Sequence, residues 1–155
     1  MNAPENTFLI IGVGNLFRCD DAVGIHIARN LNSRKTEHMS VKEQSGEGTS
    51  LMEAWKDYSR VLIVDAVSSG SLPGSIHRLD ASKTIPSNFF SCSTHNFGVA
   101  EAIELARTLN QLPEHLRLYG IEGENFEPGE ILSTEVESVV EEVTAEIFKY
   151  ITSTS

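Results

Sequence analysis

The chain has 155 residues, 40% of them hydrophobic and 22% charged, which is the composition of one folded domain with a substantial core and excludes a disordered protein. Twelve basic and 22 acidic side chains give a formal net charge of −10, so the surface repels nucleic-acid phosphates and anionic membranes. No apolar run approaches the roughly 20 residues of a membrane span, and residues 1–7 lack the basic and apolar segments of a signal peptide. These features predict a cytoplasmic protein that has neither nucleic acid nor a membrane as a partner.

The first elements along the chain are a strand and a helix. Residues 7–13 form a short apolar run that suits a buried strand, and two glycines end it. Asp20 or Asp21 then caps a predicted helix over residues 22–32, whose apolar side chains recur on one face.

The remaining elements continue the alternation of strands and helices. The clearest is a buried strand over residues 60–67, and the alternating pattern at 75–79 indicates an edge strand. Residues 80–96 lack periodicity, and an irregular stretch of this length inside a compact domain is often functional. The other predicted elements are a short strand at 41–43, a loop at 46–49, helices at 50–58, 97–109 and 133–150, and a strand at 116–121.

This order predicts an α/β fold in which helices cover both faces of a mostly parallel sheet. We expect residues 1–151 to form a single domain, followed by a flexible tail at 152–155. The two cysteines, Cys19 and Cys92, are too few for a disulfide framework and are expected to be reduced thiols.

The first candidate for chemistry is the turn after the first strand, which ends in the adjacent carboxylates of Asp20 and Asp21. The turn begins like a dinucleotide-binding fingerprint, but Phe17 stands where the third glycine is needed, and the two carboxylates repel phosphate. A nucleotide site is therefore disfavoured. Because one carboxylate is enough to cap the helix, the other is predicted to face a cleft.

The second and third candidates are Asp65 and His95. Asp65 ends the apolar run at 60–64, and ligands of α/β sheets gather beyond the carboxyl ends of parallel strands. If the strands at 7–13 and 60–67 are neighbours, Asp21 and Asp65 lie at the same sheet edge. His95 stands at the end of the irregular stretch, directly before a predicted helix.

Two carboxylates and an imidazole suit a divalent transition-metal ion with open coordination positions. The thiols of Cys19 and Cys92 are weaker candidates, because a buried free cysteine behaves as a small apolar residue.

Three stretches of the sequence, in the same order, resemble the nickel–iron hydrogenase maturation endopeptidases. The first is the most specific of them, because the glycine–asparagine turn and the acidic pair recur at fixed spacing. The stretches are Gly12-x-Gly14-Asn15-x-x-x-x-Asp20-Asp21-x-x-Gly24, Val64-Asp65-Ala66 and Thr94-His95-Asn96. The resemblance implies a three-layer α/β/α fold with a twisted sheet of about five strands.

The resemblance also implies an activity, a partner and a metal. Family members remove the C-terminal extension of a hydrogenase large-subunit precursor once nickel has been inserted. The nickel then comes with the substrate, and no organic cofactor is expected. The family's metal-contacting and catalytic positions fall on Asp21, Asp65 and His95.

One stretch departs from the family pattern. Many relatives carry Asp-Gly-Gly-Thr after the second strand, whereas this chain has Gly46-Glu47-Gly48-Thr49. If that loop contacts the substrate, the departure indicates a different class of hydrogenase.

Three other functions fit parts of the pattern. A non-enzymatic nickel- or zinc-binding module that monitors hydrogenase assembly would use the same three residues. A general metallopeptidase would need a permanent ion, and the sequence has no His-Glu-x-x-His motif. A nucleotide-binding domain is disfavoured by Phe17 and the acidic pair.

Overall fold

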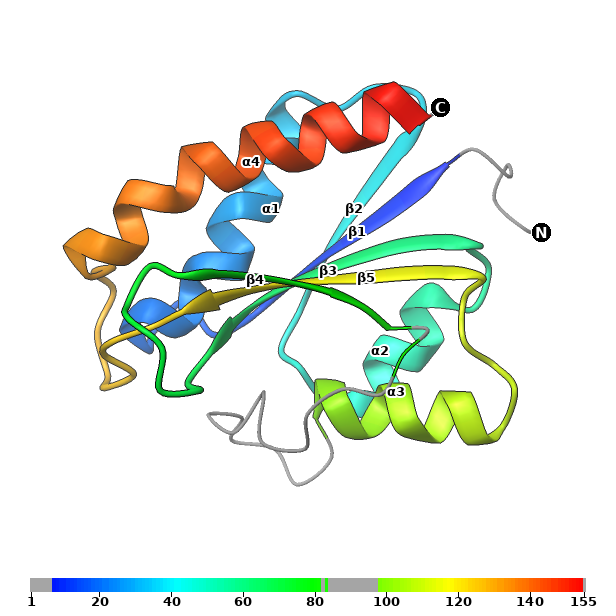
Figure 1. The fold of residues 1–155 in the computed structure, drawn as a ribbon, viewed down its shortest axis with the longest axis horizontal. Helices are drawn as coiled ribbons and strands as arrows, with labels where there is room; N and C mark the ends of the chain where they lie inside the picture. The colour runs from blue at the N-terminus through cyan, green and yellow to red at the C-terminus, as the bar shows by residue number, and fades with distance from the viewer. Residues whose placement is uncertain (1–6, 82, 84–97, 155) are drawn as a thin grey trace.

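The computed structural model describes residues 7–81, 83 and 98–154, which fold around a five-stranded sheet (Figure 1). The strands lie in the order β2-β1-β3-β5-β4. β1 pairs in parallel with β2 and β3, β3 pairs in parallel with β5, and β4 is antiparallel to β5. The strands are β1 (Phe8–Val13), β2 (Met39–Gln44), β3 (Arg60–Val67), β4 (Ile76–Asp80) and β5 (His115–Glu122).

Helices cover both faces of this sheet. Figure 1 shows α1 and α4 on one face and α2 and α3 on the other, so the predicted three-layer α/β/α fold is confirmed. The helices are the 3₁₀ helix η1 (Cys19–Ala22) and the α-helices α1 (Val23–Ser33), α2 (Gly48–Trp55), α3 (Val99–Thr108) and α4 (Thr134–Thr154). Within the described residues, no helix has the length and apolarity needed to cross a membrane.

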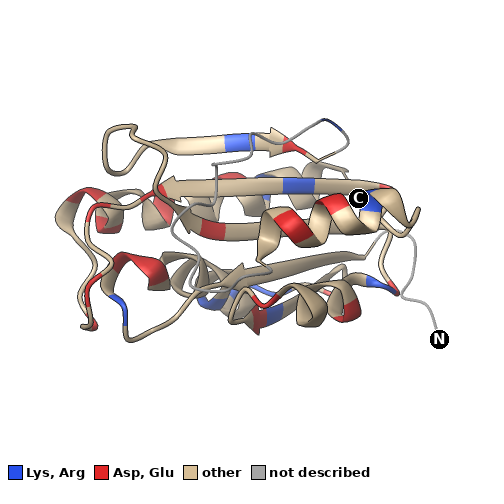
Figure 2. Cartoon of the chain, turned by 90° about the horizontal axis from the view of Figure 1, so that it is seen from below, with Lys and Arg blue, Asp and Glu red and all other residues tan. Residues whose placement is uncertain are grey.

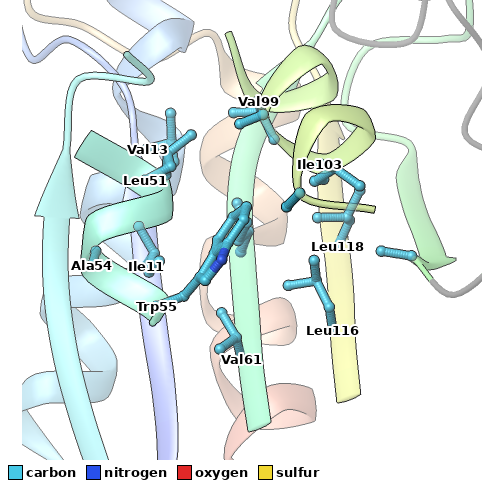
Figure 3. Packing of buried hydrophobic residues seen from close by; sticks show 14 of the residues in the cluster. Ile11, Val13, Leu51, Ala54, Trp55, Val61, Val99, Ile103, Leu116 and Leu118 are labelled. Carbon is cyan, nitrogen blue, oxygen red and sulfur yellow. The ribbon is translucent and has the colours of Figure 1, made fainter. Parts of the chain in front are cut away.

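The two faces of the sheet explain why its central strands are continuous apolar runs. Alternate side chains of β1 and β3 enter opposite core layers, one against α2 and α3 and the other against α1 and α4. In the first layer, Trp55 of α2 lies among Ile11, Val61 and Ile103 (Figure 3). An aromatic side chain of this kind buries roughly 150–250 Å², so Trp55 ties α2 to the sheet.

Several predicted boundaries differ from the observed ones. β4 is the predicted edge strand, and its place at the end of the sheet confirms it. β2 and β5 are longer than predicted, and α2 begins at Gly48 rather than in the region of Ser50. Helix α4 continues to Thr154 and so includes residues 152–154 of the segment predicted as a tail.

Helix α1 approaches the sheet closely because it carries glycine at its second position. A Cβ atom added to Gly24 would lie 2.3 Å from the carbonyl oxygen of Val64 and 2.6 Å from that of Val13. A side chain at position 24 would therefore push α1 away from the carboxyl ends of β1 and β3, where the site residues lie.

We expect Gly24→Ala to lower the free energy of unfolding by about 2–3 kcal/mol, because a methyl group there meets backbone atoms that cannot move aside. The expected loss is opposite in sign to the usual effect, since a Gly→Ala change at an unobstructed helix position raises the free energy of unfolding by up to about 1 kcal/mol. Urea denaturation of the two proteins measures the difference, and equal or higher stability of the variant would contradict the close approach.

Candidate active site

The carboxyl ends of β1 and β3 meet at one edge of the sheet and bring Asp21 and Asp65 together. β1 pairs with β3 from Phe8–Arg60 to Gly12–Val64, so Asp65 lies just beyond the last paired residue of β1. β3 spans Arg60–Val67, which are the predicted bounds of this strand, so Asp65 follows the apolar run and lies just before the last two residues of the strand. The chain continues from β1 to β2 on one side and places β3 on the other side of β1, so this edge lies at a topological switch point of the sheet. Ligands of open α/β sheets bind at such points.

Asp21 is held by the turn that follows β1. Gly14 carries φ +155°, and a Cβ atom there would lie 2.0 Å from the carbonyl oxygen of Asp21, so only glycine fits. The backbone N–H of Asn15 donates to Oδ2 of Asp21 at 3.0 Å. Asp21 remains partly exposed, and it lines a cavity of about 510 Å³.

Asp65 lies in a different environment, because its side chain is only 8% exposed. Oδ1 accepts a hydrogen bond of 2.8 Å from the backbone N–H of Ala66. Burial and the negative charge of Asp21 hold the pKa of Asp65 well above its ordinary value, and the bond from Ala66 offsets only part of this. Two neighbouring carboxylates of unequal exposure form a site that a cation would stabilise.

Asp20, the neighbour of Asp21, is fully buried and has a different role. Its carboxylate accepts hydrogen bonds from the backbone N–H groups of Glu124, Asn125 and Ser133 at 2.7–2.9 Å, and from the Ser133 hydroxyl. Burial raises the pKa of Asp20, but these hydrogen bonds outweigh it and hold the pKa below the ordinary value. Asp20 thus fastens the loop at 123–133 to the turn that carries Asp21.

The expected helix cap at Asp20 or Asp21 is therefore wrong. The chain enters α1 through η1, and neither the N-cap of η1 (Arg18) nor that of α1 (Ala22) makes a side-chain cap hydrogen bond. Asp20 makes tertiary contacts instead, and Asp21 accepts a hydrogen bond from Asn15 within the turn. The local sequence does not show this role for Asp20, because its partners lie more than 100 residues away.

We expect Asp20→Ala to lower the free energy of unfolding by about 2–4 kcal/mol, because it removes a buried carboxylate that accepts three backbone N–H groups and one hydroxyl. The loss should be largest at neutral pH. A lowered folded-state pKa gives stability that is present above the ordinary pKa and lost as the pH falls through the folded-state value. Urea denaturation measures it, with Asp57→Asn as a control at an exposed carboxylate. A loss below about 0.5 kcal/mol, as for ordinary surface changes, would contradict this role.

A third buried carboxylate at this end of the sheet belongs to Glu122 of β5. It accepts hydrogen bonds from the backbone N–H and the hydroxyl of Ser69 at 2.8 and 2.6 Å, and lies 3.1 Å from Nε2 of His77. Glu122 therefore fixes the turn between β3 and β4 beside Asp65. Sequence patterns did not indicate this contact, because it depends on the pairing of β4 with β5.

Of the other candidate metal ligands, only one lies within the described residues. His95 and Cys92 lie outside the described residues. Cys19 is buried as a free thiol, and a Cβ atom on Gly129 would lie 2.8 Å from its Sγ atom. Among residues 7–81, 83 and 98–154, no group of three or more His, Cys, Asp or Glu side chains is placed to hold a metal ion.

Comparison with known proteins identifies the family. The family model described as "Hydrogenase maturation protease" matches residues 25–150, a stretch that includes Asp65 and begins after Asp21. The chain belongs to the hydrogenase maturation protease family. It is thus a peptidase of hydrogenase maturation, and the resemblance seen in the sequence is confirmed.

Individual members of the hydrogenase maturation protease family are distant relatives. The chain is 28% identical to the hydrogenase 2 maturation protease of Escherichia coli K12 over 137 residues, covering 86% of this chain and 83% of that protein. It is 24% identical to the hydrogenase expression/formation protein HupD of Bradyrhizobium diazoefficiens, covering 77% of this chain and 64% of that protein. The structure of the hydrogenase maturating endopeptidase HybD from E. coli superimposes with a TM-score of 0.77 at 21% identity, covering 96% of this chain and 94% of that one, and shows the same fold.

The loop that departs from the pattern of other hydrogenase maturation proteases has a structural role here. Glu47 is the N-cap of α2, and its carboxylate accepts hydrogen bonds from the backbone N–H groups of Thr49 and Ser50 at 3.2 and 3.3 Å. The hydroxyls of both residues donate to it as well, and these bonds lower the pKa of Glu47. The acidic group of this loop is therefore directed to the helix end, while Ser45 lines the cavity beside Asp21.

Proposed function

We propose that this chain is the endopeptidase that removes the C-terminal extension of a nickel–iron hydrogenase large-subunit precursor after nickel insertion, and that it acts in the cytoplasm. Its family supplies the reaction class. The observation that supports the site is the meeting of Asp21 and the buried Asp65 at the carboxyl ends of β1 and β3. His95, at the matching family position, is proposed as the third residue of this site.

The metal in this proposal belongs to the substrate. Asp65 resists ionisation because it is buried and faces the charge of Asp21. An incoming nickel ion offsets both effects, since a cation favours the ionised form of a neighbouring carboxyl group. The site is therefore best matched to a precursor that already carries its metal, which makes cleavage conditional on nickel insertion.

The chemistry divides between the metal and the carboxylates. The nickel ion polarises the scissile carbonyl or lowers the pKa of a water molecule, and a carboxylate that lies within reach accepts the proton of that water. Asp21 is the more accessible of the two and lines the cavity, so it is the one that meets the precursor first. The enzyme is thus a metal-dependent endopeptidase that uses aspartates.

The surface around the site suits a cationic substrate group. The loop at 123–133 carries Glu124, Glu127 and Glu130 and no Lys or Arg. Figure 2 shows acidic positions along the loops at this end of the sheet, and a basic position there as well. Arg18 is bonded through its guanidinium group to the carbonyl oxygen of Phe126 in the loop at 123–133. Such a field attracts a metal-bearing or basic segment and repels an acidic one.

An assay of tail loss tests the proposed activity. Purified protein is mixed with a nickel-loaded large-subunit precursor from the same organism, and the mass of the precursor is followed by mass spectrometry. We expect the precursor to lose one C-terminal peptide, and a precursor made without the extension to stay unchanged. Tight binding of the precursor without any loss of mass would instead show a binding module that monitors assembly.

A further inference from the structure

A cavity lies beside Asp21, and apart from Asp21 its lining residues have no part in the proposed chemical step. Its volume is about 510 Å³, within the range of small-ligand pockets. Asp21 lies on its wall, so the cavity adjoins the site proposed for cleavage. It is lined by Gly14, Asn15, Leu16, Phe17, Asp21, Ile25, Glu43, Gln44 and Ser45.

The topology of the sheet creates this cavity. After β1 the chain turns toward α1 on one face of the sheet, whereas after β2 it turns toward α2 on the opposite face (Figure 1). The two neighbouring strands therefore end in loops that diverge, and the cavity lies between them. A crevice of this kind outside the carboxyl ends of parallel strands is a usual ligand position in α/β proteins.

Phe17 stands at this cavity with 65% of its surface exposed. Its backbone is held on both sides. The N–H of Phe17 donates to Oδ1 of Asn15 at 2.9 Å, and its carbonyl accepts from the N–H of Gly129 at 2.8 Å. The N–H of Arg18 also donates to the carbonyl of Asn15 at 3.2 Å, which closes the turn. The fold thus presents a large aromatic side chain at the cavity on a fixed backbone, and aromatic side chains are among those that most often carry binding energy.

The charges near the cavity leave an apolar wall. Glu43 is paired with Arg29 through two hydrogen bonds of 2.8 and 3.0 Å, so its charge is compensated. Leu16, Phe17 and Ile25 supply the apolar side of the lining. An apolar side chain gains free energy by leaving water against these residues, whereas an acidic one would face Asp21.

We propose that this cavity binds an apolar side chain of the precursor, within two residues of the scissile bond, with Phe17 as its main contact. The inference rests on the proposed function. An extended chain advances about 3.3–3.6 Å per residue, and the cavity adjoins Asp21, so the residue that enters it is close to the bond that is cut. Phe17 is then a residue that sets specificity, and it takes no part in the chemical step.

The experiment combines variants of the enzyme with variants of the precursor. Each of the two residues on either side of the scissile bond is replaced in turn by Leu and by Asp, and kcat/KM is measured for wild type, Phe17→Ala and Leu109→Ala. Leu109 is the control, because it is also an exposed apolar side chain but lies at the C-terminal end of α3. Binding of fluorescently labelled tail peptides with the same replacements is measured in parallel by anisotropy.

We expect one position at which wild type prefers Leu over Asp by about tenfold or more, a preference that falls to about twofold or less in Phe17→Ala and is unchanged in Leu109→Ala. The loss should lie in KM, and peptide binding should show the same pattern. The proposal is overturned if no position prefers Leu, or if Phe17→Ala keeps the full preference. Binding that depends on Phe17 without cleavage of any precursor would support the subsite and refute the proposed protease activity.

Discussion

Asp21→Asn is expected to abolish processing of the precursor while the fold stays intact. Asparagine has the same shape and can still accept the hydrogen bond from the N–H of Asn15, so the turn after β1 is preserved. The negative charge that the proposed site offers to nickel is lost. Removing even an outer-shell partner of a metal costs about 10–100-fold, so loss of a direct contact should lower kcat/KM by more than about 100-fold.

The control for this change is Asp57→Asn, which removes a carboxylate at an exposed position of the chain. Neither variant should be less stable than wild type in urea by more than about 0.5 kcal/mol, the usual limit for surface changes. Cleavage by Asp21→Asn at the wild-type rate would show that the role assigned to Asp21 is wrong. A large loss of stability in that variant would instead assign Asp21 a structural role.

Asp65→Asn is expected to make the protein more stable and inactive at the same time. Burial and the charge of Asp21 raise the pKa of Asp65. At neutral pH the Asp65 carboxyl group is therefore harder to ionise in the folded state than in the unfolded state, and this difference lowers the free energy of unfolding. Asparagine fills the same space without charge and can still accept the bond from Ala66. We expect a gain on the order of 1–2 kcal/mol in the free energy of unfolding at pH 7, and loss of cleavage.

The predicted gain in stability of Asp65→Asn depends on pH. Between the ordinary pKa of an aspartate, about 3.9, and the raised value of Asp65, the folded state binds more protons than the unfolded state. The stability of wild type therefore falls as the pH rises through this window, relative to that of Asp65→Asn. The difference between the two proteins should vanish near pH 4 and grow as the pH rises toward the raised pKa of Asp65. A variant less stable than wild type at pH 7 would mean that Asp65 stabilises the fold, contrary to the proposal.

The sequence predicted the elements that pack against a core and the residues that its strands place at one edge. The apolar runs of β1 and β3 and the acidic residues after them led to Asp21 and Asp65, and the parallel pairing of these strands confirms the step from sequence order to proximity. The burial that separates the two carboxylates could not be read from the sequence, because it depends on the elements around Asp65.

Several contacts that the sequence did not reveal join distant segments of the chain. Asp20 looked like a helix cap, but its acceptor atoms are taken by the loop at 123–133. Glu47 was noted only as part of a loop that departs from the family pattern, and it is the cap of α2. Phe17 entered the sequence argument only as an obstacle to phosphate binding, and its exposure at the cavity appears once β1 and β2 are seen to end in diverging loops.

The measurement that tests the account most directly compares cleavage of the same large-subunit precursor with and without nickel. Both preparations are incubated with the wild-type enzyme and with Asp21→Asn, and the released C-terminal peptide is quantified by mass spectrometry. The account predicts release only from the nickel-loaded precursor and only by wild type. Equal release from the nickel-free precursor would contradict the claim that cleavage requires contact between the substrate's nickel and the carboxylates of Asp21 and Asp65.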